Sequence, residues 1–212
     1  MQEAPILKEQ ITQYLPQRPI IIESGAHFGR DTVRMAALWP HAQIYAFEPV
    51  PSLYSQLLER TAPYPNITCY NIALSDHTGV ETFYECSGAS TAVSSFYEPL
   101  EYIQERPNVF FEQVKVPTIT LDEWAHKEGI TQVDAVWFDM QGAELKVLKA
   151  SPFIVATIQV MVVEASLTER FKGIPLFDEL TAWIEAQGFR IIQKDSPRHN
   201  KVNLLCVKPE LL

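Results

Sequence analysis

The sequence predicts an α/β domain built on a doubly wound, mostly parallel sheet. Along its 212 residues, short apolar and β-branched runs alternate with segments of helical periodicity, as in strands joined by crossover helices. The first runs are continuously apolar, which is typical of strands buried on both faces. The last two runs are joined by a polar turn that is too short for a parallel crossover, so they predict an antiparallel hairpin.

The first predicted strand spans residues 19–23 and reads Pro-Ile-Ile-Ile-Glu. Its apolar run ends at an acid and a glycine-containing loop, as expected at the carboxyl edge of a buried parallel sheet. A helix is expected at 29–38, because Pro40 cannot continue it. The elements that follow are a strand at 42–48, a helix at 51–60 opened by Ser52, and a strand at 66–73.

The alternation breaks between residues 82 and 116. The stretch 85–113 mixes serine, glycine, proline and aromatic side chains, and so long a segment inside a compact domain is usually a functional loop. We therefore expect a lid-like insertion at about 85–113. The alternative is a partly helical insertion that packs its aromatic side chains into the core.

The alternation resumes after the insertion. The expected elements are a helix at 121–128, a strand at 134–139, a helix at 143–149, a strand at 157–164 and a helix at 176–186 closed by Gly188. Strands at 189–194 and 202–207 form the antiparallel hairpin and bring the expected total to seven. We expect a helical N-terminal segment over residues 1–18 and a single domain over residues 19–212.

Charge and cysteine content narrow the class of protein. Asp and Glu outnumber Lys and Arg by 26 to 17, and the net charge of −9 disfavours nucleic acid or an anionic membrane as a partner. Three cysteines without a Cys-x-x-Cys pair predict neither a disulfide framework nor a cysteine-based zinc site, and they favour a reducing, cytoplasmic setting. Residues 1–15 lack a signal-peptide pattern, and the most apolar window, 153–163, is too short to span a membrane.

In open α/β sheets a ligand binds beyond the carboxyl ends of the strands, so the residues that follow each strand are the candidate site. After the first strand the chain reads Glu-Ser-Gly-Ala-His-Phe-Gly at residues 23–29. Gly25 and Gly29 allow a tight turn with close approach of a ligand to the backbone. The Gly-x-Gly-x-x-Gly pattern of dinucleotide sites is absent, and Glu23 favours a ligand with an ammonium or sulfonium group. A generic strand-to-helix turn is the alternative.

Two further loops favour an adenosine-bearing ligand. Glu48 and Pro49 follow the second strand about twenty residues after the glycine loop, the spacing at which a carboxylate binds the ribose hydroxyls. Residues 71–76 follow the third strand, where an adenine ring would lie; an ordinary capped turn is the alternative. These features do not separate a nicotinamide dinucleotide from S-adenosylmethionine (SAM).

Acidic residues also end the fourth and fifth strands. Asp139 follows a very apolar strand and precedes a glycine and a helix, which places it over the centre of the predicted pocket. Its alternative role is to cap the helix that begins near Ala143. Glu164 ends the next apolar strand, where a buried acid needs a partner or a raised pKa.

Five motifs in one order carry a specific resemblance: Glu-x-Gly-Ala-His-x-Gly, Ala-Phe-Glu-Pro-Val-Pro, Asn-Ile-Ala-Leu-Ser-Asp, Thr-Leu-Asp-Glu-Trp and Asp-Met-Gln-Gly-Ala-Glu-Leu-Lys-Val-Leu-Lys. Over residues 20–189 the chain resembles the FkbM-type family of class I SAM-dependent methyltransferases. The resemblance implies a Rossmann-like fold, SAM as methyl donor and S-adenosylhomocysteine (SAH) as product. It also implies that the acceptor is a hydroxyl of a small natural product or a glycan.

The resemblance further implies roles for single residues. Cofactor contacts are expected from Glu23, Ser24, Gly25, Gly29, Glu48, Pro49, Ala73, Ser75, Asp76 and Asp139. Asp139, Glu164 and His27, in that order, are the candidate general bases for a hydroxyl. Residues 87–111 are our hypothesis for an acceptor lid. No set of metal ligands is defined by the sequence.

Two motifs depart from the usual family pattern. The first loop more often reads Asp-x-Gly-Ala-Asn-x-Gly, so Glu23 and His27 differ. The pattern Lys-x-Asp-x-Glu-Gly is altered at Trp137 and Gln141, which changes the charge beside the methyl acceptor. Two other functions are therefore kept as alternatives: an NAD(P)-dependent oxidoreductase on a similar sheet, and a catalytically silent SAM- or nucleotide-binding module. Three features argue against the oxidoreductase: the missing dinucleotide pattern, the acid at Glu23 and the terminal antiparallel hairpin.

Overall fold

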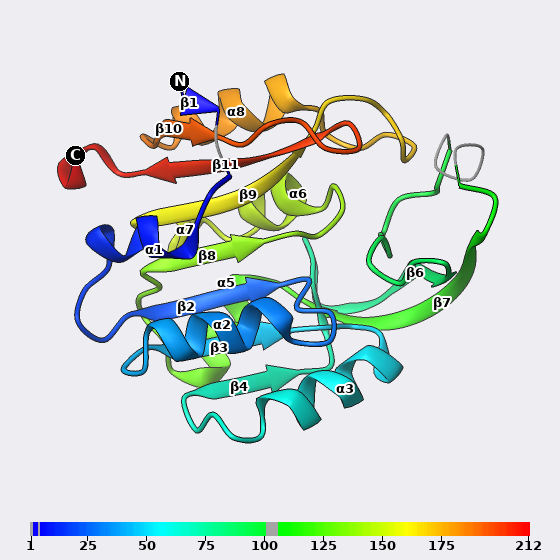
Figure 1. Cartoon of the computed structure of the whole chain (residues 1–212), viewed down its shortest axis with the longest axis horizontal. Helices are drawn as coiled ribbons and strands as arrows, with labels where there is room; N and C mark the ends of the chain where they lie inside the picture. Colours follow the sequence, from blue (N-terminus) through cyan, green and yellow to red (C-terminus); the bar gives the residue numbers. More distant parts are fainter. Residues whose placement is uncertain (1, 4, 101–105) are drawn as a thin grey trace.

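The structure is a computed structural model that describes residues 2–3, 5–100 and 106–212. Its main sheet has the strand order β1-β10-β11-β9-β8-β2-β3-β4 (Figure 1). The strands are β1 (Gln2–Glu3), β2 (Ile20–Ser24), β3 (Gln43–Phe47), β4 (Ile67–Tyr70), β8 (Ala135–Phe138), β9 (Val160–Ser166), β10 (Arg190–Lys194) and β11 (Lys201–Val207).

The centre of the sheet is parallel and its C-terminal part is antiparallel. β2 pairs in parallel with β3 and β8, and parallel pairs also join β3 to β4 and β8 to β9. β11 lies antiparallel between β9 and β10. The predicted seven-stranded, mostly parallel sheet with a terminal antiparallel hairpin is therefore confirmed. The two-residue strand β1 adds an edge strand, parallel to β10, that was not predicted.

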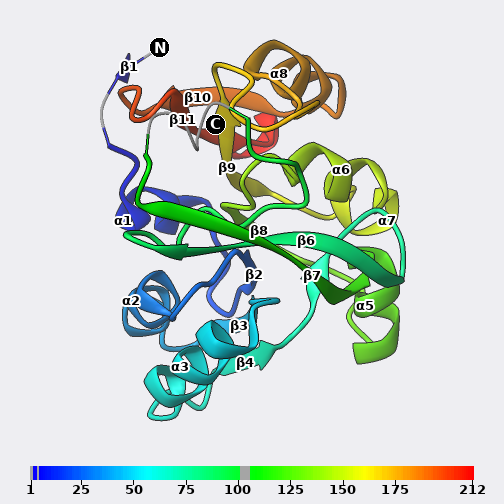
Figure 2. The same ribbon diagram turned by 90° about the vertical axis from the view of Figure 1, so that its right-hand side faces the viewer.

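Helices cover both faces of the sheet, which makes it doubly wound (Figure 2). One face carries α1 (Lys8–Ile11), α2 (Arg30–Leu38) and α3 (Pro51–Thr61), and the other carries α5 (Leu121–Glu128), α6 (Glu144–Lys149), α7 (Pro152–Val155) and α8 (Phe177–Ala186). Short 3-10 helices are η1 (Thr12–Tyr14) and η2 (Pro209–Leu211). Among the described helices, none has both the length and the apolar character needed to cross a membrane.

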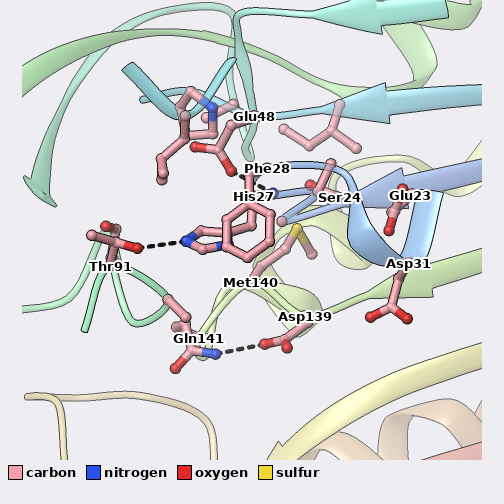
Figure 3. A pocket seen from close by; sticks show the side chains of 18 of the residues that line it. Glu23, Ser24, His27, Phe28, Asp31, Glu48, Thr91, Asp139, Met140 and Gln141 are labelled. Atoms are coloured by element: carbon pink, nitrogen blue, oxygen red, sulfur yellow. Dashed lines mark hydrogen bonds between the residues drawn. The ribbon is translucent and has the colours of Figure 1, made fainter. Parts of the chain in front are cut away.

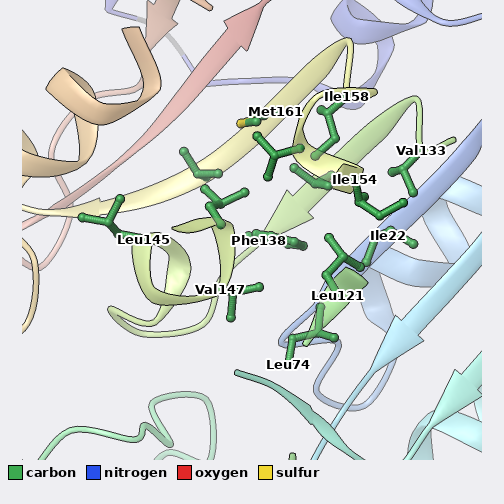
Figure 4. Packing of buried hydrophobic residues seen from close by; sticks show 14 of the residues in the cluster. Ile22, Leu74, Leu121, Val133, Phe138, Leu145, Val147, Ile154, Ile158 and Met161 are labelled. Atoms are coloured by element: carbon green, nitrogen blue, oxygen red, sulfur yellow. The ribbon is translucent and has the colours of Figure 1, made fainter. Parts of the chain in front are cut away.

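Successive residues of a strand enter two different cores. Ile21 packs in the same core as Met35 of α2, whereas Ile22 packs in the same core as Leu148 of α6. The second core lies between the sheet and α5 to α7, where Phe138 and Met161 are almost fully buried (Figure 4). Burial on both faces explains the continuously apolar strands and holds their carboxyl ends in place.

The insertion is a second, three-stranded sheet beyond the carboxyl ends of the parallel strands (Figure 1). It consists of β5 (Ala73–Leu74), β6 (Gly79–Gly88) and β7 (Val109–Ile119), with β6 and β7 paired antiparallel. The described parts of the predicted insertion, 85–100 and 106–113, contain no helix, so the partly helical alternative is wrong there. Residues 101–105 lie outside the described residues.

The aromatic side chains of the insertion pack against one another, against the start of α3 and against a neighbouring loop. The Phe83 and Phe96 rings meet edge to face at 5.1 Å between centroids. Phe111 of β7 meets Phe171 at 6.1 Å. Phe83 and Phe96 belong to one small core with Leu53 of α3. Phe111 and Phe171 belong to another, so two small cores hold the insertion to the body of the domain.

Beyond shifts of one residue at an end, three predicted strands and helices of the domain differ from the structure. The strand expected at 66–73 is divided, because the chain leaves the main sheet after Tyr70 and Ala73 pairs with Thr118 of β7. Helix α3 begins at Pro51 after an N-cap at Val50, so Ser52 does not open it. The fifth parallel strand begins at Val160, because the preceding residues form α7 and the turn that ends it.

Candidate active site

A cavity of about 340 Å³ lies at the carboxyl ends of β2, β3 and β8 (Figure 3). Eight of the predicted site residues line it: Glu23, Ser24, Gly25, His27, Glu48, Pro49, Ala73 and Asp139. Its apolar walls include Leu53, Leu74, Phe83, Phe96 and Trp137. The cavity therefore combines one apolar side with several carboxylates, at the place where open α/β sheets bind ligands.

The glycine loop is folded against the backbone of the neighbouring strand end. Gly25 has a φ of 85°, and a Cβ atom at this position would lie 1.9 Å from the carbonyl oxygen of Asp139. The amides of Gly25 and Ala26 both donate to the Phe47 carbonyl, at 3.2 and 3.1 Å. His27 also adopts a positive φ, of 53°. The loop therefore requires a residue without a side chain at position 25.

Glu48 joins the glycine loop to the start of α3. One carboxylate oxygen accepts a hydrogen bond from the His27 amide and the other from the Val50 amide, each at 2.9 Å. The residue is 4% exposed, and burial raises the pKa of Glu48 to about 7 although both amides favour the charged form. Its carboxylate borders the cavity at the position predicted for the ribose.

Glu23 is a buried carboxyl group without a full set of partners. It is 2% exposed, and its Oε2 atom accepts no hydrogen bond from any group that the structure describes. Burial raises the pKa of Glu23 to about 8, with the nearby Asp31 and Asp139 carboxylates adding to the effect. Such a group is stabilised in its charged form by a cation that enters the cavity.

Asp139 lines the cavity, and its carboxylate accepts a hydrogen bond from the Gln141 side chain. The side-chain amide of Gln141 donates to Asp139 at 2.5 Å (Figure 3). It also donates to Glu164, at 3.2 Å. Gln141 has a φ of 54°, and its backbone carbonyl accepts from the Ser95 hydroxyl at 2.9 Å. The alternative role of Asp139 as a helix cap is not observed. Instead, Glu144 accepts from the Met140 and Gly142 amides before α6.

Glu164 contacts the Gln141 side chain and is not among the residues that line the cavity. It forms an ion pair with Lys201 of β11 at 2.8 Å, and each side chain is 12% exposed. Lys201 also contacts the side-chain oxygen of Gln141. Burial and the Asp139 charge raise the pKa of Glu164, against the attraction of Lys201. The sequence pattern did not identify Lys201, whose pairing arises from the antiparallel strand beside β9.

Lys201→Met is expected to lower the free energy of unfolding by about 3 kcal/mol, because it leaves the Glu164 carboxyl group buried without its cation. The double variant Lys201→Met/Glu164→Gln should recover most of that loss, as urea unfolding will measure. Lys149→Met is the control, since its ion pair with Glu179 is exposed and worth about 1 kcal/mol or less. Equal losses in the single and double variants would contradict the prediction.

The insertion closes one side of the cavity. His27 Nε2 and the Thr91 hydroxyl share a hydrogen bond of 2.8 Å that joins the glycine loop to the insertion (Figure 3). Thr91, Ala92, Ser94 and Phe96 line the cavity, and none of them was predicted as a site residue. Burial lowers the pKa of His27, which favours its neutral form. Sequence periodicity could not place this wall, because its position depends on the β6–β7 pairing.

Three predicted cofactor contacts lie away from the cavity. Ser75 donates to Glu81 at 2.8 Å, and Asp76 lies beside His77 at 2.8 Å and Lys146 at 3.4 Å. These residues turn away because β5 belongs to the second sheet, and Ala73 and Leu74 line the cavity instead. Gly29 begins α2, where a Cβ would lie 2.8 Å from Leu57. Its role is the close packing of α2 on α3.

Lys8 of the N-terminal segment reaches the same region. Its Nζ lies 2.7 Å from Asp31 Oδ1 and 3.8 Å from the centroid of the Trp137 ring. Lys8 is 5% exposed, whereas the Asp31 side chain is 47% exposed. Asp31 and Trp137 both line the cavity, so Lys8 contacts two lining residues at the end of the cavity next to Glu23 without lining the cavity itself.

Comparison with known sequences places this site in a family. The family model described as the methyltransferase FkbM domain matches residues 23–191. The 2-O-methyltransferase NoeI of Sinorhizobium fredii (strain NBRC 101917 / NGR234) is 29% identical over 161 residues, which are 73% of this chain and 66% of NoeI. Methyltransferase sdnD of Sordaria araneosa is 26% identical over 169 residues, 64% of this chain and 61% of sdnD. The chain spans less than two thirds of the length of each relative.

Solved structures share the fold. Fibrillarin from Aeropyrum pernix, in complex with natively bound SAM, superposes with a TM-score of 0.53 at 12% identity and covers 91% of this chain and 69% of its own. At these levels of identity the similarity concerns the arrangement of helices and strands.

Proposed function

Because the chain belongs to the FkbM methyltransferase family, we propose that it transfers a methyl group from SAM to a hydroxyl of a small natural product or glycan and releases SAH. The name of the relative NoeI, a 2-O-methyltransferase, supports oxygen as the methylated atom. The observation that carries the choice of cofactor is the buried, partly unpartnered carboxyl group of Glu23 in the cavity.

The cavity suits the three parts of SAM. The Glu23 carboxylate would bind the methionine ammonium, and Glu48 would accept hydrogen bonds from the ribose hydroxyls. The apolar wall at Leu53, Leu74 and Phe83 would cover the adenine ring. A dinucleotide fits less well, because its pyrophosphate would enter a cavity bordered by acidic side chains.

The chain's own contribution to methyl transfer is to align the acceptor oxygen and receive its proton. Bound SAM supplies an electrophilic methyl group on a sulfonium, which becomes a neutral thioether after transfer. Asp139 is the proposed general base: exposed to the cavity and held by Gln141, it can take the hydroxyl proton as the new carbon–oxygen bond forms.

The other two candidate bases have different positions. Glu164 does not border the cavity and is paired with Lys201, so we assign it to the support of Gln141 and thereby of Asp139. His27 borders the cavity, but its Nε2 is bonded to Thr91, and its role is to hold the insertion against the glycine loop. The insertion residues from Thr91 to Phe96 would border the acceptor, as the lid hypothesis expects.

A screen with methyl-labelled SAM over hydroxylated metabolites and glycans tests the reaction. We expect a labelled methyl group on a former hydroxyl oxygen of the acceptor and loss of this labelling in Asp139→Asn, while calorimetry shows that SAM and SAH still bind this variant. Tight SAM binding without turnover of any acceptor would favour a silent binding module. Binding of NAD in place of SAM would overturn the proposal.

Glu48→Ala should weaken SAM binding by roughly 1–3 kcal/mol, the range for losing hydrogen bonds to a charged group. The variant also leaves the His27 and Val50 amides without their acceptor, so Glu48→Gln is needed as a milder change. Calorimetry with SAM and with adenine alone separates loss of the ribose contact from a general disturbance of the site. If only the ribose contact is lost, the affinity for adenine should stay the same. Unchanged SAM affinity in both variants would mean that the ribose lies elsewhere.

A further inference from the structure

Lys8 is a buried cation that lies outside the part of the chain matched by the family model, residues 23–191. It belongs to α1, a short helix packed on the edge of the core through Ile11. Its ammonium group is held between the Asp31 carboxylate and the face of the Trp137 ring. Burial of a lysine is costly unless the charge has partners, and both partners of Lys8 are residues that line the cavity.

The charges of Lys8 and of the nearby acids are opposite to those of an amino-acid group, which carries an ammonium and a carboxylate. Glu23 and Asp31 line the cavity at this end, and Glu23 has an oxygen without a hydrogen bond. An amino-acid group carries an ammonium and a carboxylate on the same carbon, and it needs an anion and a cation side by side. Glu23 and Lys8 provide these charges from β2 and α1.

We propose that Lys8 binds the carboxylate of the methionine part of SAM, next to the ammonium bound by Glu23; this inference rests on the proposed function. The ammonium of lysine has three donors, and the Asp31 carboxylate accepts from one of them. Asp31 is half-exposed, so it can share the ammonium group or turn toward solvent when a ligand carboxylate enters. The face of the Trp137 ring stabilises the charge of Lys8.

Decarboxylated SAM tests the proposal, because it keeps the ammonium and the sulfonium and lacks only the carboxylate. In Lys8→Met, calorimetry should show SAM and SAH binding weakened about tenfold to a hundredfold, the range for one charged hydrogen bond. The affinity for decarboxylated SAM should change less than threefold. Lys8→Arg keeps the charge and should retain most of the preference for SAM over its decarboxylated form.

Lys208→Met is the matched control. The Lys208 ammonium also lies over an aromatic ring, 4.2 Å from the Phe189 centroid, and donates to the Gln187 carbonyl, away from the cavity. This variant should bind SAM and decarboxylated SAM as the wild type does. Urea unfolding of each variant shows whether the chain is folded under the binding conditions.

Equal losses for SAM and decarboxylated SAM in Lys8→Met would overturn the inference and leave the proposed function standing. The inference would also be overturned if Arg30→Met lost the preference for SAM over decarboxylated SAM while Lys8→Met kept it, because Arg30 lines the cavity directly. Failure of the wild-type chain to bind either compound would instead contradict the proposed cofactor.

Discussion

Gly25→Ala is expected to lower the free energy of unfolding by about 2 to 6 kcal/mol and to abolish SAM binding. A Cβ atom here would lie 1.9 Å from the Asp139 carbonyl oxygen, so the glycine loop and the end of β8 would have to separate. Overpacking against backbone and a positive φ each cost about 1–3 kcal/mol. Urea unfolding and calorimetry measure the two effects.

The control for this variant is Gly129→Ala. Gly129 has a φ of 69°, but no atom lies within 4 Å of the position where its Cβ would be. It therefore isolates the backbone cost, about 1 kcal/mol, and SAM binding should be unchanged. If the two alanine variants lost the same stability, the contact between the glycine loop and Asp139 would not be the cause.

Glu23→Gln is expected to flatten the dependence of stability on pH in the unliganded protein. The pKa of Glu23 is raised from an ordinary 4.5 to about 8 by burial, so the folded chain binds more protons than the unfolded chain between these values. The free energy of unfolding of the wild type therefore falls as the pH rises from about 5 to 8. At pH 8 the glutamine variant should be more stable than the wild type by about 4 kcal/mol.

The same substitution should weaken the binding of SAM, because the methionine ammonium loses its anion; about 1.5 to 3 kcal/mol is expected. If Glu23→Gln is more stable than the wild type but binds SAM less tightly, the Glu23 carboxylate serves ligand binding and not the stability of the fold. Glu179→Gln, which changes an exposed acid of α8, is the control: it should alter stability by about 1 kcal/mol or less and leave SAM binding unchanged. Part of the fall should persist in Glu23→Gln, because burial also raises the pKa of Glu48 and of Glu144 to about 7 and raises that of Glu164. A difference in stability between Glu23→Gln and the wild type that stays constant from pH 5 to 8 would contradict the prediction.

Much of the site could be predicted because it depends on local order along the chain. Glu23, Gly25 and Glu48 each follow a strand directly, and parallel strands bring such positions to one edge of the sheet. Ser75 and Asp76 follow a strand in the same way, yet they lie outside the cavity. Their strand β5 pairs with β7, and nothing in the local pattern reveals that pairing.

The sequence by itself determined the alternation of strands and helices, the antiparallel end of the sheet and the carboxylates at the strand ends. These features follow from periodicity and from turn length, which short stretches of chain contain. Tertiary structure alone decided that Lys201 supports Gln141 from β11, that Thr91 meets His27, and that the Lys8 ammonium lies over Trp137. Each of these contacts joins residues at least 60 positions apart, so they depend on how whole elements pack and not on any pattern within one of them.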